Sequence, residues 1–406
     1  MSDGRGLQSP PPVGFRVVAA GTPRPVWTST FFAAAIMGDS ALYVLLPAFA
    51  PRLGLSLFAI GILLSVNRWI RLPANPLAAR ASERWGLNRL YLAAMGAATV
   101  TTACWAVPLP LPAWLAARVG WGLAFAILRL ARLATVAERP SPRVAGLSQA
   151  VFRAGSAAAV LSAGLLAARW GFYGPFRLYA LVATMATAAA IWGEVRRRPW
   201  GPPSVWAVPG PTVPLARGQV AVGLGAFTGQ FVVDGVLVAT LGYFVATRWG
   251  SPVQVDPVVL EAAALTGMVL SGRWIAEIVL ARPMGAMADR LGHGIDVPLA
   301  LLLTASGLLD ITRADGAGAF LGGAALTWLG RTALGVGLDA AATQTAGTRP
   351  AADVARYATL GDLGAALGPL LAGLGGPAHL EALYVLGAAL LVGSAAVYAG
   401  PRRREG

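Results

Sequence analysis

The hydrophobic positions of this sequence form long continuous runs rather than alternating or one-sided stripes. Runs of about 20 apolar residues, the length that crosses a bilayer as a helix, recur between short clusters of Pro, Gly and Arg. When the sequence is divided at those clusters, the pattern predicts twelve membrane-spanning helices, at residues 28–50, 57–76, 89–110, 113–136, 145–168, 175–194, 218–247, 258–281, 296–312, 318–342, 355–376 and 380–399.

The segment between the sixth and seventh predicted helices is too polar and too rich in proline to span a membrane. It reads RRRPWGPPSVWAVPGPTVPLAR and separates two sets of six helices. We therefore predict a cytoplasmic tail (1–26), a first six-helix bundle (27–195), a cytoplasmic linker (196–217), a second six-helix bundle (218–399) and a second cytoplasmic tail (400–406).

The composition supports an all-α integral membrane protein. Hydrophobic residues make up 56% of the 406 residues before the 50 glycines are counted, only 12% are charged, and the mean hydropathy is +0.63. Soluble domains contain roughly 45–50% apolar residues with glycine included. A single soluble core of this size cannot bury so much apolar surface.

The charge distribution indicates membrane topology rather than nucleic-acid binding. All 32 strongly basic residues are arginine, and the net charge is +14. If both termini are cytoplasmic, 19 of these arginines lie in inside segments, five in outside segments and eight within spans. Positive residues are enriched on the cytoplasmic side of membrane proteins. Adding or removing one helix in the first half would reverse this asymmetry, so the count favours twelve spans with both ends inside.

The two halves of the chain resemble each other, which indicates an internal repeat. At slowly changing offsets, residues of the first half match residues of the second in the same order. The matched pairs that carry charge are Asp39 with Asp234, Arg68 with Arg273, Arg118 with Arg331, and Arg153 with Asp362.

The most specific motif lies at the predicted cytoplasmic end of the eighth helix and reads Gly285-Ala-Met-Ala-Asp289-Arg290-Leu-Gly292. A second copy, after the second helix, reads Ala79-Arg-Ala-Ser-Glu83-Arg84-Trp-Gly86. Both resemble the Gly-x-x-x-Asp-Arg-x-Gly loop signature of the major facilitator superfamily. The second copy has Ala for the first Gly and Glu for Asp. The resemblance implies that these are gating loops, and a plain topology-determining turn is the alternative.

The resemblance covers residues about 27–400 and implies a specific fold. It is the fold of that superfamily, with two pseudo-symmetric six-helix bundles, a substrate site between them near the membrane midplane, and transport by rocking of one bundle against the other. Arg118 and Gly122 resemble the superfamily's Arg-x-x-x-Gly motif. Gly146, Gly155 and Gly164 have the spacing of its antiporter-associated motif, but Ala159-Val160 stands where that motif has Gly-Pro.

Ionisable groups within the spans are the candidate functional residues, because such groups are costly in a bilayer, by about 2.5–3.5 kcal/mol each on insertion scales. Nine of them form the predicted substrate and proton pathway: Asp39, Arg68, Arg118, Arg153, Asp234, Arg273, Glu277, Arg331 and Asp362.

Two roles are open for these nine residues. Asp39 and Asp234, one in each half, are the hypothesised carboxylates that take up a proton or a cation, while the arginines are candidates for binding an anionic substrate, because guanidinium clamps carboxylate or phosphate. The alternative is that the acids and arginines pair only with one another and fix the register of the helices.

The sequence therefore predicts a secondary active transporter of a small solute, coupled to protons and suited to an organic anion. Drug or metabolite efflux by proton antiport is one alternative, and a non-transporting receptor or assembly protein with this fold is another. We expect no enzyme activity, no cofactor and no metal, since Cys104 is the single cysteine and no Cys/His cluster or Walker motif occurs.

The sequence also predicts the cellular location and the partners of the protein. We predict a multi-pass protein of a bacterial-type inner (plasma) membrane with cytoplasmic termini. Its partners are a small-molecule substrate, protons and the lipid bilayer, without nucleic acid, and we expect a monomer.

Overall fold

The computed structural model describes residues 24–137, 142–195, 217–255, 258–344 and 350–399. The first half contains α1 (Arg24–Ala35), α2 (Met37–Leu53), α3 (Leu57–Trp85), α4 (Leu87–Cys104), α5 (Leu111–Ala137), α6 (Pro142–Trp170) and α7 (Tyr173–Val195). The second half contains α8 (Arg217–Gly229), η1 (Gln230–Leu237), α9 (Val238–Trp249), β1 (Val253–Val255), β2 (Val258–Leu260), α10 (Ala262–Leu291), α11 (His293–Arg313), α12 (Ala317–Gln344), α13 (Pro350–Gly375), η2 (Pro377–His379) and α14 (Leu380–Ala399). Most of the predicted tails and linker, residues 1–23, 196–216 and 400–406, lie outside the described residues.

These helices combine into twelve spans across the described residues. α1 and α2 form one span, and α8, η1 and α9 form another. Ten of the twelve have both the length and the hydropathy to cross a membrane. The other two, α4 and α12, are more polar: Asn88 and Arg89 lie in the first turn of α4, and α12 carries Arg331 and Asp339. The predicted all-α membrane fold is confirmed, and ten of the twelve predicted spans meet both criteria.

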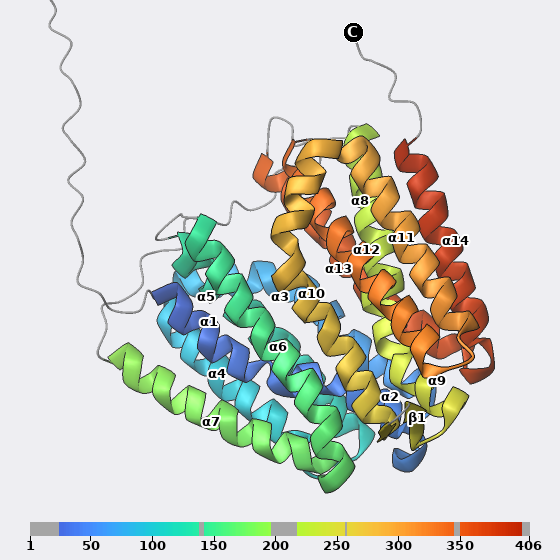
Figure 1. The fold of residues 1–406 in the computed structure, drawn as a ribbon. Coiled ribbons are helices and arrows are strands. Elements are labelled where there is room, and N and C mark those ends of the chain that lie inside the picture. Colours follow the sequence, from blue (N-terminus) through green and yellow to red (C-terminus); the bar gives the residue numbers. More distant parts are fainter. Residues whose placement is uncertain (1–23, 138–141, 196–216, 256–257, 345–349, 400–406) are drawn as a thin grey trace, which may run out of the picture.

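The helices form two bundles, α1 to α7 and α8 to α14, which lie side by side in Figure 1. Two long contacts join the bundles, α6 with α10 and α3 with α13, and these contacts are related by the internal repeat. In the first, Gly164 lies directly against the backbone of Ala264; in the second, Gly373 lies directly against the backbone of Phe58. Small residues permit such close approach of helices.

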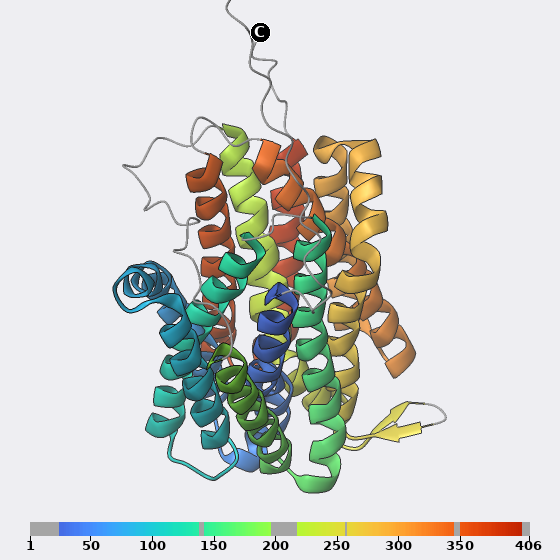
Figure 2. The same cartoon turned by 90° about the vertical axis from the view of Figure 1, so that its left-hand side faces the viewer.

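One end of the space between the bundles is closed by apolar packing. Near this end α2 packs along α9, and Leu45, Val44, Leu241 and Val245 are fully buried there in one continuous hydrophobic core. The antiparallel hairpin of β1 and β2 projects from the same end (Figure 2). At the other end the bundles separate, and the opening between them is lined with polar groups.

Helix boundaries differ from the sequence predictions in several places, and the third predicted helix, for example, ends at Cys104 rather than at 110. Residues 258–260 form strand β2, whereas the predicted eighth helix began at 258. α3 and α10 also continue about ten residues past their predicted ends, to Trp85 and Leu291. Both gating motifs therefore lie on helix ends rather than in loops. The turn after each of these helices is formed by the last glycine of the motif, Gly86 or Gly292. These two residues have φ of 82° and 71°, a backbone conformation that suits glycine.

Candidate functional site

A cavity of about 330 Å³ lies between the two bundles. Its wall is formed by α1, α2, α3, α5 and α6 of the first bundle and by η1, α9, α10, α12 and α13 of the second. Ligand pockets in proteins commonly have volumes of about 300–1,000 Å³. Among the described residues that line it are seven arginines and three aspartates: Arg68, Arg71, Arg129, Arg132, Arg153, Arg273, Arg331, Asp39, Asp234 and Asp362. The wall therefore carries an excess of positive charge.

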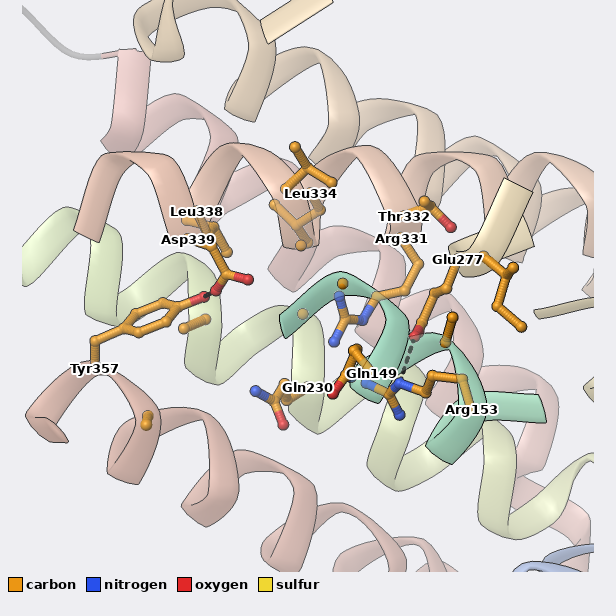
Figure 3. Close-up of a pocket in the computed structure, with 18 of the residues that line it drawn as sticks. Gln149, Arg153, Gln230, Glu277, Arg331, Thr332, Leu334, Leu338, Asp339 and Tyr357 are labelled. Carbon is orange, nitrogen blue, oxygen red and sulfur yellow. Dashed lines mark hydrogen bonds and ion pairs between the residues drawn. The ribbon is translucent and has the colours of Figure 1, made fainter. Parts of the chain in front are cut away.

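This cavity continues into a wider vestibule of about 1080 Å³. Figure 3 shows its polar lining, in which Gln149 and Arg153 of α6 face Gln230 of η1 and Arg331 of α12. Farther along, the Tyr357 hydroxyl donates a hydrogen bond to Asp339, with 2.6 Å between the oxygens. The vestibule opens at the end where α6 begins and where α10 and α12 finish, opposite the apolar closed end.

Asp39 lies on α2 and pairs with Arg118 of α5 within the first bundle. Arg118 also donates from Nε to the backbone oxygen of Leu63 at 2.7 Å, and Asn67 donates to Asp39 at 3.3 Å. Only 1% of the Arg118 side chain is exposed, and the described wall of the cavity does not include it. Arg118 thus binds Asp39 on the side that faces away from the cavity.

Asp234 lies at the matching place in the second bundle. Its Oδ2 accepts hydrogen bonds from Nη2 and Nε of Arg331, at 2.8 and 3.0 Å, and its Oδ1 pairs with Arg273. The pair of Asp39 with Arg118 and the pair of Asp234 with Arg331 are therefore equivalent under the internal repeat. Asp234 sits in the π-helical segment η1, a rare conformation that is frequent at functional sites.

Three polar contacts connect the bundles across the cavity. Arg153 pairs with Glu277 at 3.1 Å, and Arg129 pairs with Asp362 at 3.5 Å. Arg68 of α3 donates to the backbone oxygens of Asp234, at 3.0 Å, and of Ala365. Charged residues of one half thus bind partners in the other half. The internal repeat identifies equivalent residues of the two halves, and it did not predict these contacts between them.

The structure brings the nine residues of the predicted pathway into one connected region. Seven of them line the cavity, Glu277 lines the adjoining vestibule, and Arg118 is buried behind Asp39. Five further charged residues of the two spaces were not among the predicted nine: Arg71, Arg129, Arg132, Arg282 and Asp339. Arg71, Arg129 and Arg132 lie inside predicted spans, so the cost of an intramembrane charge is the signal that could have identified them.

The two predicted gating motifs are exposed at the open end. Glu83, Arg84, Asp289 and Arg290 are solvent-exposed, and within the described part of the chain none of them forms an ion pair. The remaining motif positions are Ala79 in α3, Gly285 in α10, and the turn glycines Gly86 and Gly292. A search of the described residues finds no group of three or more His, Cys, Asp or Glu side chains arranged to hold a metal.

Comparison with known proteins agrees with this architecture. The family model of the Major Facilitator Superfamily matches residues 28–275. The fold is similar to that of the nucleoside transporter NupG, with a TM-score of 0.72 at 10% identity over 92% of this chain and 98% of that one.

Two further solved structures have the same fold. A bacterial homologue of the human lysosomal transporter Spinster, in an inward-facing and unoccupied conformation, has a TM-score of 0.74 at 13% identity, covering 93% of this chain and 97% of that one. The human organic anion transporter MFSD10 has a TM-score of 0.65 at 18% identity, covering 93% and 100%. None of the curated protein sequences compared with the chain matches it significantly.

Proposed function

The chain belongs to the major facilitator superfamily of membrane transporters for small solutes, and from this premise we propose that it moves an organic anion by alternating access, coupled to protons. One observation carries the proposal: an arginine-rich cavity lies between the two bundles, closed at one end by apolar packing and open at the other. A transporter of this type needs no enzymatic step and no cofactor.

The charge of the cavity favours an anionic substrate. Among its described lining residues, arginines outnumber aspartates seven to three. Guanidinium groups bind carboxylate and phosphate in a planar, two-point geometry. A cationic solute would meet repulsion from the same wall. The likeness to an organic anion transporter, MFSD10, is compatible with this substrate class, although at 18% identity it supports the fold alone.

The contacts between the bundles support alternating access. In the observed conformation the apolar packing of α2 with α9 closes one end, while the vestibule leads to the other. Rocking of the bundles would open the first end and close the second. The exposed motif residues Glu83, Arg84, Asp289 and Arg290 lie at the open end, where they would pair with neighbouring helix ends in the opposite conformation.

For proton coupling, we assign the central role to Glu277 and Asp362 among the predicted carboxylates. Each forms an ion pair with an arginine of the other bundle, so protonation of either removes an attraction between the bundles. Asp234, by contrast, binds two arginines of its own bundle. Glu277 is also faced by Arg273 of its own helix, at 3.5 Å. Protonation of the bridging acids would thereby favour one conformation.

The distribution of arginines supports a proposed orientation of the chain in the membrane. We propose that both termini are cytoplasmic, that the vestibule opens to the cytoplasm, and that the protein is a monomer of an inner (plasma) membrane. The positive-inside distribution supports this orientation. Labelling of single cysteines placed at Glu83 and at Gln254, from each side of intact cells, tests it directly.

Transport itself is tested with purified protein in proteoliposomes. Vesicles loaded with one unlabelled organic anion are expected to take up the same labelled anion by counterflow, and an imposed pH gradient should change net flux. Matched neutral amides and quaternary amines serve as controls. Counterflow only of the cations or neutral compounds would contradict the anion assignment, and counterflow of no solute would contradict the transport proposal.

A further inference from the structure

The arginines of the cavity differ in how closely an acid or a backbone oxygen pairs with them. Among the described residues, the four acids of the predicted pathway pair with five arginines at 3.5 Å or less: Asp39 with Arg118, Asp234 with Arg273 and Arg331, Glu277 with Arg153, and Asp362 with Arg129. Arg68 is occupied by two backbone oxygens. Two lining arginines remain, Arg71 of α3 and Arg132 of α5.

Neither Arg71 nor Arg132 has a carboxylate within hydrogen-bond distance. The nearest acid to Arg71 is Asp39, with 3.9 Å between nitrogen and oxygen. Arg132 donates to the amide oxygen of Gln149 at 2.9 Å, which carries no net charge. The Nε of each arginine is buried and has no hydrogen-bond acceptor. Buried donors without an acceptor are rare in native proteins and call for an explanation.

Three phenylalanine rings pack together next to these two arginines, with Phe32 only 1% exposed and Phe125 and Phe152 exposed by 9% and 7%. The guanidinium of Arg71 lies over Phe125, 3.5 Å from the ring centroid, and that of Arg132 lies 5.2 Å from the centroid of Phe152. Phe32 joins the two rings, with centroid separations of 5.4 Å to Phe125 and 4.7 Å to Phe152. All three phenylalanines line the cavity. Stacking on an aromatic face holds a guanidinium without neutralising it.

We propose that Arg71 and Arg132 bind the anionic group of the substrate, and that its aromatic or flat apolar body packs against the cavity-lining edges of Phe125 and Phe152, which Phe32 supports from within the core. The substrate class is therefore an aromatic carboxylate or a comparable amphiphilic organic anion. This inference rests on the proposed transport of an organic anion and adds its binding residues. A bound anion supplies a close opposite charge, which Arg71 has only at 3.9 Å, in Asp39, and which Arg132, hydrogen-bonded to the neutral Gln149, lacks among the described residues.

The same arrangement predicts that these two arginines can be removed without collapse of the fold. Loss of a paired arginine leaves a buried carboxylate without a partner, which is strongly destabilising. Arg71 and Arg132 leave no such carboxylate, since Asp39 keeps Arg118. Variants at the two positions therefore separate substrate recognition from stability.

Binding by purified full-length protein tests the site, with 2-naphthoate as the probe. Its neutral amide, 2-naphthamide, tests the charge, and butyrate tests the aromatic surface. Wild-type protein is expected to bind 2-naphthoate saturably, at least about tenfold more tightly than either control. Equal affinity for 2-naphthoate and 2-naphthamide overturns the anion-binding role, and equal affinity for butyrate overturns the role of the rings.

Arg71→Gln and Arg132→Gln are each expected to weaken 2-naphthoate binding about tenfold or more, because each removes a hydrogen bond to a charged group. Arg132→Lys should restore binding only in part, since lysine lacks the planar fork. Arg282→Gln, in the vestibule but outside the deep cavity, is the matched control and should change binding less than twofold.

The outcomes distinguish this inference from the proposed function. If wild type binds and transports 2-naphthoate and the double variant Arg71→Gln/Arg132→Gln binds it equally well, the assigned residues are wrong while anion transport stands. If wild type transports only cations or neutral solutes, the anion proposal fails with it.

Discussion

Arg153 of α6 and Glu277 of α10 form an ion pair across the two bundles, with 3.1 Å between Nε and Oε2. The guanidinium of Arg153 also lies over the ring of Trp274, 4.5 Å from its centroid. Both helices line the vestibule, so this pair joins the bundles on the proposed path of the substrate (Figure 3). On this proposal, loss of the contact makes it easier for the bundles to separate.

The first prediction concerns the role of this pair in proton coupling. Glu277→Gln should make transport much less sensitive to an imposed pH gradient, because the side chain no longer takes up a proton, while counterflow without a gradient persists. Both side chains are partly exposed, so the loss of stability should stay within about 1 kcal/mol. Flux measured at several pH values in proteoliposomes provides the check, with Glu381→Gln at the exposed pair with Arg248 as control. An undiminished response to the gradient would remove Glu277 from the coupling mechanism.

The second prediction concerns the buried pair of Asp39 and Arg118. Arg118→Gln should destabilise the protein by about 3–5 kcal/mol, because it leaves a buried carboxylate without its main partner. The thermal transition of the protein in detergent is the measurement. Adding Asp39→Asn to this variant should recover part of the loss, since the uncompensated charge is gone. A double variant no more stable than Arg118→Gln alone would show that the pair is not a charge pair of this kind.

The third prediction compares Asp39→Asn with the bridging acids. Asp39 pairs with Arg118 of its own bundle and does not bridge the two bundles. Asp39→Asn should therefore lower the stability of the protein but leave the pH dependence of transport unchanged. Asp362→Asn should instead alter that dependence, because Asp362 pairs with Arg129 of the other bundle. Purified variants reconstituted at equal density allow the two profiles to be compared. A changed profile for Asp39→Asn would favour the sequence-based hypothesis that Asp39 carries the proton.

The fourth prediction uses two glycines of α6. A Cβ at Gly164 would lie 2.8 Å from the Ala264 Cα of α10, so Gly164→Ala should destabilise the contact between the bundles. A Cβ at Gly146 meets nothing within 4 Å, and alanine is the better helix former by about 1 kcal/mol. Gly146→Ala should therefore be neutral or stabilising. Thermal transitions of both variants test this, and equal losses would argue against tight packing of α6 on α10.

The fifth prediction concerns the gating motifs. Asp289→Asn should change the stability of the observed conformation by less than about 0.5 kcal/mol, because Asp289 is exposed and forms no ion pair among the described residues. Transport should slow, since the motif would act when the bundles close at this end. Thermal shift and counterflow measured on the same preparation separate the two effects. A large loss of stability without loss of transport would contradict the gating role.

Local pattern in the sequence was sufficient for most of the spans, the repeat and the identity of most buried charges. The lengths of apolar runs and the cost of charge in a bilayer act on each segment by itself, so they can be recognised without a structure. The repeat also placed Asp39 and Asp234 at equivalent positions. The extended ends of α3 and α10 were missed because polar residues such as Arg84 and Asp289 continue a helix beyond the apolar run.

Only the tertiary structure decided which partner each charge has. The rotation of each helix and the contact between bundles turn Arg68 toward the backbone of Asp234 and Ala365, while its repeat equivalent Arg273 pairs with the Asp234 side chain. The same rotations leave Arg71 and Arg132 over phenylalanine rings and, among the described residues, without a carboxylate within hydrogen-bond distance. An ion pair forms between side chains more than 100 residues apart, such as Arg153 and Glu277, and hydropathy within one segment carries no information about that distance.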